Sequence, residues 1–382
     1  MSHFEAERAH EKLKSFHLIC LCVFLLLGAG LVTLYSASYS SATRLYSNGN
    51  HFIIRQLQMA IPGLALFFIL SRIDLEKLRK FSFPLVVIAA VLCIATLIPN
   101  IGIERNGASR WIKIGIFNYQ PSEFVKFILP FYLAHLLDKK SGNTDGGSAV
   151  LTPVAVTVVF FILIYAQNNF STAVFIVFNA LVIFFLAGMR LRYFISAVIM
   201  TIPISAILIF TEDHRVRRLV SFLRPSWDPR DAGMQVNASR DAIVSSGFWG
   251  MGIGEGTRKI ASIPEIHSDF IFSAFVEETG FLGIILFFAL FASFAFLGYR
   301  TAWRSKSIFN KLLAAGLTTM IVSQVLLNVA VVSGALPATG IPLPFFSAGG
   351  SSLITTLICA GFIGNAARKN DENYAITGGR YE

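Results

Sequence analysis

The sequence contains little charge, few acids and few cysteines, and each shortage excludes a class of protein. Charged residues make up 14% of its 382 residues, against about 25% in an average soluble domain, so an ordinary soluble fold is excluded. Its four cysteines lie in apolar runs, without metal-ligand spacing or an extracytoplasmic pair to oxidise, so no cysteine metal site or disulfide is expected. Lys and Arg outnumber Asp and Glu by 32 to 22. We assign the net charge of +10 to contact with anionic lipid headgroups and expect no nucleic acid partner.

Long apolar runs are what the sequence has in abundance. Hydrophobic residues make up 54% of the chain, and the mean hydropathy is +0.64. A run of about 18 to 25 apolar residues can cross roughly 30 Å of hydrocarbon as a helix. Ten such runs lie at 16–37, 52–71, 82–99, 121–137, 150–166, 171–188, 192–210, 269–298, 312–333 and 349–367. The sequence therefore predicts an all-α polytopic membrane protein with about ten transmembrane helices.

Loop charge and polarity predict the orientation and the division of the chain. Lys and Arg are more numerous on the side of both termini, and the long loop at 211–268 can be translocated regardless of its charge. Both termini are therefore predicted to be cytoplasmic. We expect a cytoplasmic segment at 1–15, a transmembrane domain at 16–368 that includes the extracytoplasmic loop, and a disordered cytoplasmic tail at 369–382.

The first unusual outer segment, 103–127, alternates basic, aromatic and glycine positions before a predicted helix. Pro121 suits the first turn of that helix. Glu123 and Lys126 are three residues apart and therefore share a helix face. Two interpretations stay open. The pair is either a structural ion pair or part of a polar substrate cavity, since ionisable groups at membrane depth usually face a protein interior or water.

A cluster of arginines opens the long outer loop. Any one of them fits a solvated basic surface, but for the cluster we favour an anion site, because guanidinium groups match phosphate oxygens in two-point geometry. The arginines are Arg215, Arg217, Arg218, Arg224 and Arg230.

The third outer segment, 333–352, is apolar but cannot form a continuous helix. Its prolines and glycines interrupt any helix between two predicted spans. Irregular backbone near membrane depth survives only when it is buried in protein or lines a cavity. We therefore predict a re-entrant segment that packs under the outer loop.

Three acids, Asp269, Glu277 and Glu278, stand at the start of another apolar run. Helix capping alone explains Asp269 if the helix begins there. Glu277 is rotated by only ~80° from Asp269 on an ideal helix, so both can face one interior. The alternative to capping is a catalytic role, because an acid at the mouth of an arginine-rich pocket suits a general base for a hydroxyl nucleophile.

Several motifs in a fixed order give the chain a resemblance to a known family. They are YSAS (35–38), RQ (55–56), GASRWI (107–112), QPSEFVK (120–126), the run from SFLRPSWDP to GMQ (221–235), HSDFIFSAFVEETGFLG (267–283) and GIPLPFFSAGGSS (340–352). The chain resembles the SEDS family (shape, elongation, division and sporulation), which includes RodA and FtsW, and two of the motifs favour the FtsW-like branch. The resemblance implies a peptidoglycan glycosyltransferase of the bacterial cytoplasmic membrane. Such enzymes polymerise lipid II at the outer membrane face together with a class B penicillin-binding protein and other divisome or elongasome proteins.

The resemblance also implies the roles of individual residues. Asp269 occupies the position of the essential aspartate and is expected to act as general base in an inverting transfer. The residues expected to bind substrate are Arg110, Glu123, Lys126, Arg215, Arg218, His267, Glu277, Ser347, Gly349 and Gly350. A divalent cation, Mg2+ or Mn2+, is the cofactor that the family implies, although the sequence shows no dedicated ligand cluster, and no organic cofactor is expected.

One departure from the family pattern and two rival functions stay open. Many relatives have an aspartate where this chain has Asn169, so either that carboxylate is dispensable or Glu277 or Glu278 replaces it. A lipid II flippase is the main rival function, because buried acids and arginines also suit a headgroup pathway. Against it, the polar segments gather on one face. A non-catalytic scaffold for a penicillin-binding protein is the second rival.

Overall fold

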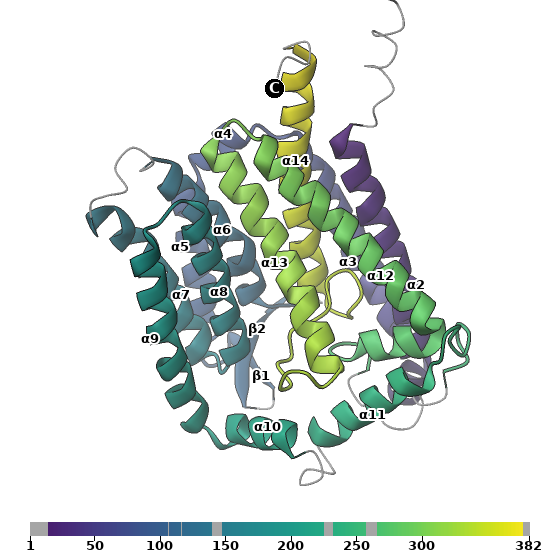
Figure 1. Ribbon diagram of the computed structural model, residues 1–382. Helices are drawn as coiled ribbons and strands as arrows, with labels where there is room; N and C mark the ends of the chain where they lie inside the picture. The colour runs from purple at the N-terminus through teal and green to yellow at the C-terminus, as the bar shows by residue number, and fades with distance from the viewer. Residues whose placement is uncertain are drawn as a thin grey trace, which may run out of the picture.

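The computed structural model shows a bundle of long helices whose two described ends lie on the same side (Figure 1). It describes residues 14–105, 107–115, 117–139, 147–224, 232–256 and 266–376. Helix α2 (Ser15–Tyr46) begins where α14 (Gly350–Ile376) ends. The predicted placement of both termini on one side agrees with this arrangement; that this side is cytoplasmic stays a prediction.

A helix lies at each of the ten predicted apolar runs. Besides α2 and α14, these helices are α3 (His51–Arg72), α5 (Ser82–Ala95), α6 (Pro121–Lys139), α7 (Gly147–Ala166), α8 (Phe170–Leu186), α9 (Leu191–Phe210), α12 (Ile271–Arg304) and α13 (Ile308–Val332). By length and composition, five of them are candidate membrane spans within the described residues: α2, α3, α12, α13 and α14. The polytopic helical fold is therefore confirmed, and the count of ten spans stays a prediction.

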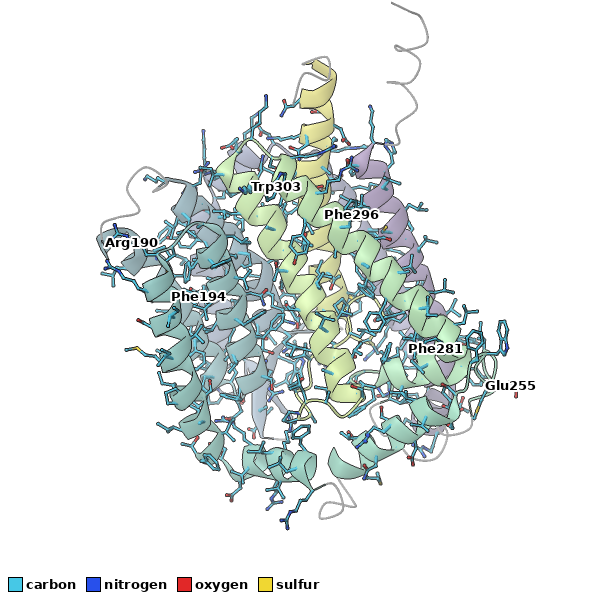
Figure 2. All side chains as sticks on the ribbon, viewed as in Figure 1. Arg190, Phe194, Glu255, Phe281, Phe296 and Trp303 are labelled. Carbon is cyan, nitrogen blue, oxygen red and sulfur yellow. The ribbon has the colours of Figure 1, made fainter. Side chains whose placement is uncertain are left out.

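The outer faces of the helices carry large apolar side chains, as expected for contact with lipid. Phe296 and Trp303 of α12 project away from the bundle (Figure 2) and are 64% and 84% exposed. In a protein that buries apolar groups away from water, exposure of two large apolar side chains about two turns apart on one helix is consistent with a hydrocarbon environment. The short helix α4 (Leu75–Arg79) connects α3 and α5 at the end of the bundle where the chain termini lie.

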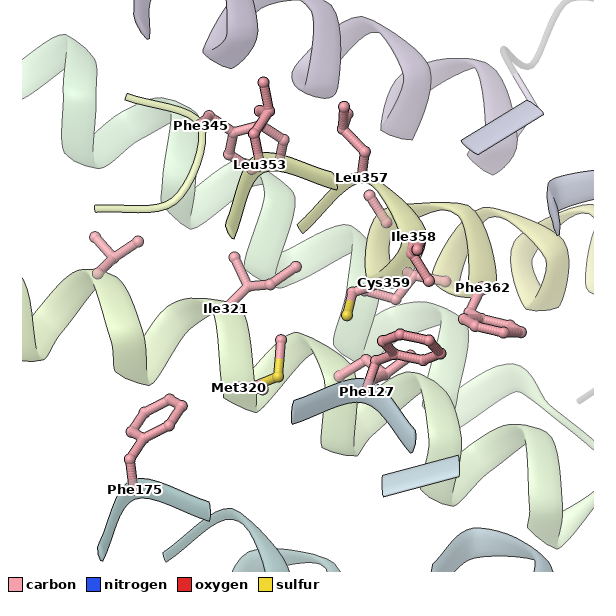
Figure 3. Packing of buried hydrophobic residues seen from close by; sticks show 14 of the residues in the cluster. Phe127, Phe175, Met320, Ile321, Phe345, Leu353, Leu357, Ile358, Cys359 and Phe362 are labelled. Carbon is pink, nitrogen blue, oxygen red and sulfur yellow. The ribbon is translucent and has the colours of Figure 1, made fainter. Parts of the chain in front are cut away.

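Helix α14 occupies the middle of the bundle and packs most closely against α3. At Gly63 of α3, an added Cβ would lie 2.6 Å from Leu357, and at Gly361 of α14 it would lie 2.9 Å from the Phe67 carbonyl oxygen. Small residues therefore allow the two backbones to approach closely, as is common between membrane helices. Around Cys359 and its neighbours, side chains from α6, α13 and α14 fill the interior (Figure 3).

The C-terminal tail is helical further than we predicted. Helix α14 continues to Ile376, so the prediction of disorder is wrong for 369–376, while 377–382 lie outside the described residues. Side-chain contacts anchor the extension. Asn370 Nδ2 donates to the Thr301 carbonyl at 2.8 Å, and Arg368 pairs with Glu372 at 2.9 Å. These contacts explain why a polar sequence remains helical beyond the apolar run.

A small sheet interrupts the helical architecture at the opposite end. Strands β1 (Gly102–Arg105), β2 (Ala108–Ile114) and β3 (Phe117–Tyr119) form an antiparallel sheet in the order β1-β2-β3. Trp111 pairs with Ile103, and Ile112 pairs with both Gly102 and Tyr119. The sequence analysis did not foresee these strands, which lie in the segment 103–127 that it had singled out.

Two more helices cross this end of the bundle within the long loop. Helices α10 (Asp213–Leu223) and α11 (Ala232–Ser245) lie across the end opposite the C-terminus (Figure 1). The loop at 211–268 is therefore partly helical rather than a plain connection. Of the five clustered arginines, Arg230 lies outside the described residues.

Helix α12 begins later than predicted and is broken. Its N-cap is Phe270, and Gly280 has φ 66° and ψ −161° inside it. The main chain of 247–252 forms hydrogen bonds to α12 residues before and after the break. Met251 N donates to Glu277 O at 2.9 Å, and Phe281 N donates to Gly247 O at 3.0 Å. The glycine-rich stretch of the outer loop therefore satisfies backbone groups that the break leaves open.

The proline- and glycine-rich segment is irregular and buried, as predicted. Regular helix ends at Val332 and resumes at Gly350, and several side chains between them, including Phe345 and Phe346, are fully enclosed. A Cβ added to Gly30 of α2 would lie 2.2 Å from the Phe345 carbonyl oxygen, so α2 packs directly on this segment. Phe345 itself has φ 68°, a conformation that a non-glycine residue keeps only when its surroundings enforce it.

Candidate functional site

A large cleft opens at the end of the bundle that carries the sheet and α10. Its volume is about 1130 Å³, and its walls come from α3, β2, β3, the start of α6, α10, residues 267–270 and the segment before α14. The predicted site residues that line it are Asp269, Arg110, Glu123, Arg218, His267, Gly349 and Gly350. Residues far apart in the sequence are thus brought to one cavity, which is large enough for a sizeable ligand.

Asp269 lies at the cleft wall, just before the start of α12. It precedes Phe270, the N-cap of α12, where no side-chain capping bond is found. Asp269 is therefore not the N-cap residue but stands one position before it, and the capping explanation stays a prediction. The side chain is half-buried and approaches Gly340, where an added Cβ would lie 3.5 Å from Asp269 Oδ2.

Three successive main-chain carbonyls around Asp269 are held by hydrogen bonds. Ala348 N donates to His267 O at 2.8 Å. Ser347 Oγ donates to Ser268 O, and Asn328 Nδ2 donates to Asp269 O at 3.0 Å. Residues 267–269 are thus attached to the re-entrant segment and to α13. These bonds hold the backbone position from which the Asp269 side chain projects.

The re-entrant segment is itself held from α3 by Gln56. Gln56 Nε2 donates to the Ser347 carbonyl at 3.0 Å, and Gly349 N donates to Gln56 Oε1 at 3.3 Å. The Ser347 hydroxyl also accepts from Leu343 N at 2.7 Å. Ser347 was predicted to bind substrate, but it is not among the described lining residues, and its hydroxyl bonds the main chain of residues 268 and 343.

Four arginines bring positive charge to the cleft: Arg55, Arg110, Arg217 and Arg218. Arg110 of β2 donates through Nη2 to the Asn168 carbonyl, and Arg218 of α10 donates through Nη1 to Ala338 O at 3.3 Å. Asp269 interacts favourably with both guanidinium groups. Burial, followed by repulsion from Arg218, lowers the pKa of Arg110 to about 10, so this arginine remains charged at neutral pH.

Arg215 is close to this site but does not line the cleft. Its guanidinium lies over the rings of Tyr165, at 4.7 Å, and Phe170, at 5.2 Å. It also donates to Tyr165 Oη at 3.0 Å and to Leu208 O at 2.7 Å. These contacts attach α10 to α7, α8 and α9, so the structure gives Arg215 a structural role in place of the predicted contact with substrate.

The Glu123–Lys126 pair is formed, and only one of its members faces the cleft. Lys126 Nζ lies 2.7 Å from Glu123 Oε1, and both side chains are almost fully buried. Glu123 lines the cleft, whereas Lys126 lies behind it, 5.7 Å from the ring of Phe175. Both open interpretations therefore describe part of the pair: the ion pair exists, and its acid belongs to the cavity.

The acids on α12 lie away from the described cleft lining. Glu277 and Glu278 are buried but are not among the described lining residues, and Glu278 accepts a bond from Ser36 Oγ. Asn169 does line the cleft and donates to Ser122 Oγ at 3.3 Å. Among the described lining residues, Glu123 is the acid that shares the cleft with Asp269.

Several lining residues were missed in the sequence analysis. They are Arg55, Gln56, Trp111, Asn118, Tyr119, Gln120 and Ser351, whereas Arg217 of the predicted arginine cluster and Asn169 had been singled out and also line the cleft. Most lie inside or beside the motifs that carried the family resemblance. Their closeness to these motifs could have identified them from the sequence. Within the described ranges no group of three or more His, Cys, Asp or Glu side chains could hold a metal ion.

Sequence comparisons connect this fold and cleft to named proteins. The model of the FtsW, RodA and SpoVE family, described as cell cycle protein, matches residues 16–372. The probable peptidoglycan glycosyltransferase FtsW of Geobacter metallireducens is 37% identical over 341 residues, which cover 89% of this chain and 91% of the relative. Stage V sporulation protein E of Bacillus subtilis is 35% identical over 353 residues, 92% of this chain and 96% of the relative.

Solved structures show the same architecture. A chain from a study of polymerization and crosslinking by a peptidoglycan synthase complex has a TM-score of 0.77 at 25% identity, covering 92% of this chain and 97% of its own length. The rod shape determining protein RodA of Thermus thermophilus has a TM-score of 0.68 at 24% identity, covering 92% and 96%. The second similarity concerns the fold alone.

Proposed function

Because the chain belongs to the FtsW, RodA and SpoVE family of cell cycle proteins, we propose that it is a peptidoglycan glycosyltransferase. Its substrate would be lipid II, which it polymerises into β-1,4-linked glycan strands at the outer face of the bacterial cytoplasmic membrane. The observation that carries the proposal is the position of Asp269 in a large cleft beside Arg110 and Arg218. A carboxylate base and cations for a diphosphate leaving group are the parts that this reaction requires.

The proposed reaction is a single displacement with inversion. The 4-hydroxyl oxygen of an acceptor N-acetylglucosamine attacks the anomeric carbon of a donor N-acetylmuramic acid, and the bond from that carbon to the diphosphate oxygen breaks. Asp269 accepts the hydroxyl proton as the new bond forms, and undecaprenyl diphosphate leaves with the bonding electron pair. An α-linked donor gives a β-linked product, so no covalent sugar–enzyme intermediate is needed.

Arg110 and Arg218 are proposed to stabilise the departing diphosphate. Guanidinium groups donate two parallel bonds to phosphate oxygens, and fixed charges at the point where negative charge develops lower the barrier without reorganisation. Both residues line the cleft with Asp269. Arg215, held on Tyr165 and Phe170, would act by keeping α10 and its Arg218 in place.

A divalent cation, Mg2+ or Mn2+, is part of the expected chemistry but does not fit a resident protein site. The part of the chain that the structure describes has no cluster of three potential ligands. We therefore derive no step through a metal.

A protein partner is expected from the similarity to a synthase complex. We propose that the chain works with a class B penicillin-binding protein, which would crosslink the strands, and with other proteins of the divisome or elongasome. The FtsW names of several relatives favour cell division, and the similarity to Stage V sporulation protein E keeps sporulation as the alternative role.

A liposome assay tests the proposal and separates it from a flippase. The purified protein is reconstituted and supplied with labelled lipid II on its outer face, and glycan strands are resolved by gel electrophoresis. We expect polymer from the wild type and none from Asp269→Ala at matched protein levels. Movement of lipid II across the bilayer without polymer would identify a flippase, and polymer from Asp269→Ala at the wild-type rate would overturn the assignment of the base.

A further inference from the structure

Two buried amides stand one turn apart on the apolar helix α13. Gln324 and Asn328 are 2% and 1% exposed. A buried amide in such a helix is costly unless it is hydrogen-bonded. Their bonds should therefore show what they hold in place.

Asn328 joins Asp269 to the re-entrant segment. Its Nδ2 atom donates to Asp269 O at 3.0 Å and to Ile341 O at 2.9 Å, so one amide group bridges two separate stretches of backbone. Gln324 holds the next carbonyl along the segment, since its Nε2 atom donates to Pro342 O at 2.8 Å. One turn of α13 thus binds two successive carbonyls of the segment and the carbonyl of the proposed base.

Gln324 also contacts the Glu123–Lys126 ion pair. Lys126 Nζ lies 3.4 Å from Gln324 Oε1 and 2.7 Å from Glu123 Oε1. Contacts therefore lead from Glu123 through Lys126 to Gln324, from Gln324 to the Pro342 carbonyl, and from the neighbouring Ile341 carbonyl through Asn328 to the backbone of Asp269. Its two ends, Glu123 and Asp269, are the acids that line the cleft within the described residues.

We propose that Gln324 and Asn328 are positioning residues that set the place of the Asp269 carboxylate relative to Glu123. The proposal rests on the proposed function of the cleft. Neither amide is among the described lining residues, so neither would touch the substrate. Asp269 lies in a turn before α12, one residue ahead of the N-cap Phe270. Loss of the amide bonds would let that turn shift, and a displacement of about 1 Å can cost about 100-fold in rate.

The test compares Asn328→Leu with a matched change on the same helix. Asn310→Leu is the control, because Asn310 is also buried on α13 and lies about five turns away on the same face. We expect Asn328→Leu to lower kcat for lipid II polymerisation by about 30- to 100-fold, with KM for lipid II within about twofold of the wild type. Asn310→Leu should leave both parameters within about twofold, at the same membrane-extracted yield.

Two further variants keep the proposal testable if Asn328→Leu does not fold. Asn328→Gln retains both amide hydrogens and should recover part of kcat. Gln324→Leu should lower kcat with KM unchanged, and the double Leu variant should lose less than the product of the single losses, since both amides hold one segment. A purely structural role would lower the melting temperature of the Leu variants while leaving kcat per folded molecule unchanged.

The outcomes separate this proposal from the proposed function. A wild type that makes no polymer overturns the function. An active wild type with an inactive Asp269→Ala, together with Asn328→Leu and Gln324→Leu variants that match Asn310→Leu in kcat, overturns the positioning role alone. A raised KM at unchanged kcat also overturns it, because it would show that the amides contribute to substrate binding.

Discussion

The two ends of the bundle bury polar side chains in different ways. At the end where α2 begins and α14 ends, polar groups bond to one another or to helix carbonyls: Arg79 binds His135 and Asp138, and Asn365 donates to Leu70 O and Ile73 O. At the other end, Asp269, Glu123 and Arg110 line an open cleft of about 1130 Å³. Polar side chains thus bond within the protein at one end, whereas at the other end similar side chains line a cleft that a ligand can enter.

The comparison shows why burial of charge alone does not identify a site. A buried charge whose partners are all in the protein contributes to the specificity of the fold, whereas one at a cavity wall can bind or react. The distinction predicts that substitutions at the cleft change the rate and leave stability nearly intact. Substitutions at the opposite end should do the reverse.

The largest expected effect is the loss of the proposed base. Asp269→Asn removes the proton acceptor with little change in shape, so polymerisation of lipid II should fall by about 10²- to 10⁴-fold. The melting temperature should stay within error. Glu104→Gln, at an exposed position on β1 outside the cleft, is the control and should be fully active in the same gel assay. A control variant that lost as much rate would show that the assay responds to outer-face charge in general.

The second effect contrasts two arginines. Arg110→Gln removes a positive charge from the cleft and should lower kcat by about 10²- to 10³-fold. This is the typical cost of removing one hydrogen-bond donor that stabilises the charge developing in a transition state. Arg79→Gln, at the other end, leaves Asp138 without its partner, so it should lower the melting temperature and spare the rate per folded molecule. Steady-state kinetics and thermal unfolding of both variants check this. Equal rate losses in the two variants would contradict the division between the ends.

A third prediction tests the support under the cleft. An added Cβ at Gly30 would lie 2.2 Å from the Phe345 carbonyl oxygen, whereas at Gly28 nothing lies within 4 Å. Gly30→Ala should therefore shift the re-entrant segment, at a cost of about 1 to 3 kcal/mol in the free energy of unfolding, and reduce activity. Gly28→Ala makes the same chemical change on the same helix and should be neutral or slightly stabilising. A Gly30→Ala variant as stable and active as Gly28→Ala would show that the segment can move aside.

The smallest expected effect concerns the extended end of α14. Glu372→Gln removes an exposed ion pair with Arg368, four residues earlier on the helix, which should cost only about 0.3 to 0.5 kcal/mol. Polymerisation should not change, because the pair lies at the far end of the bundle from the cleft. Thermal unfolding at low and high salt measures the difference, which should shrink as salt screens the pair. A rate change would indicate coupling between the two ends that the contacts do not predict.

Much of the fold was predictable because hydropathy acts locally. Each of the ten apolar runs contains a helix, and the helix-breaking residues at 333–352 marked an irregular segment correctly. The sheet at 102–119 was missed because its strands are short and lack strict alternation. The tail at 369–376 was misjudged because its helix depends on contacts such as that of Asn370 with Thr301, which composition does not reveal.

The site was predictable where a residue was unusual for its surroundings. Asp269 and Arg110 stood out as charges beside apolar segments, and both line the cleft. Arg215 stood out equally, yet it packs on aromatic rings, since sequence does not show which face of α10 meets the protein. Gln324 and Asn328 were not noticed, because a single amide in an apolar helix is common and its partners lie on other elements.

From the amino acids alone follow the membrane-embedded helical bundle, the three segments that differ from plain connections and an acid at the start of an apolar run, because each depends on residues close together in the chain. Only the tertiary structure decides which side chains meet. Asn328 contacts Asp269 across 59 positions, and Gln56 contacts Ser347 across 291. Such pairings arise when helices pack, since packing determines which buried amide finds which carbonyl and which charge is left facing the cleft.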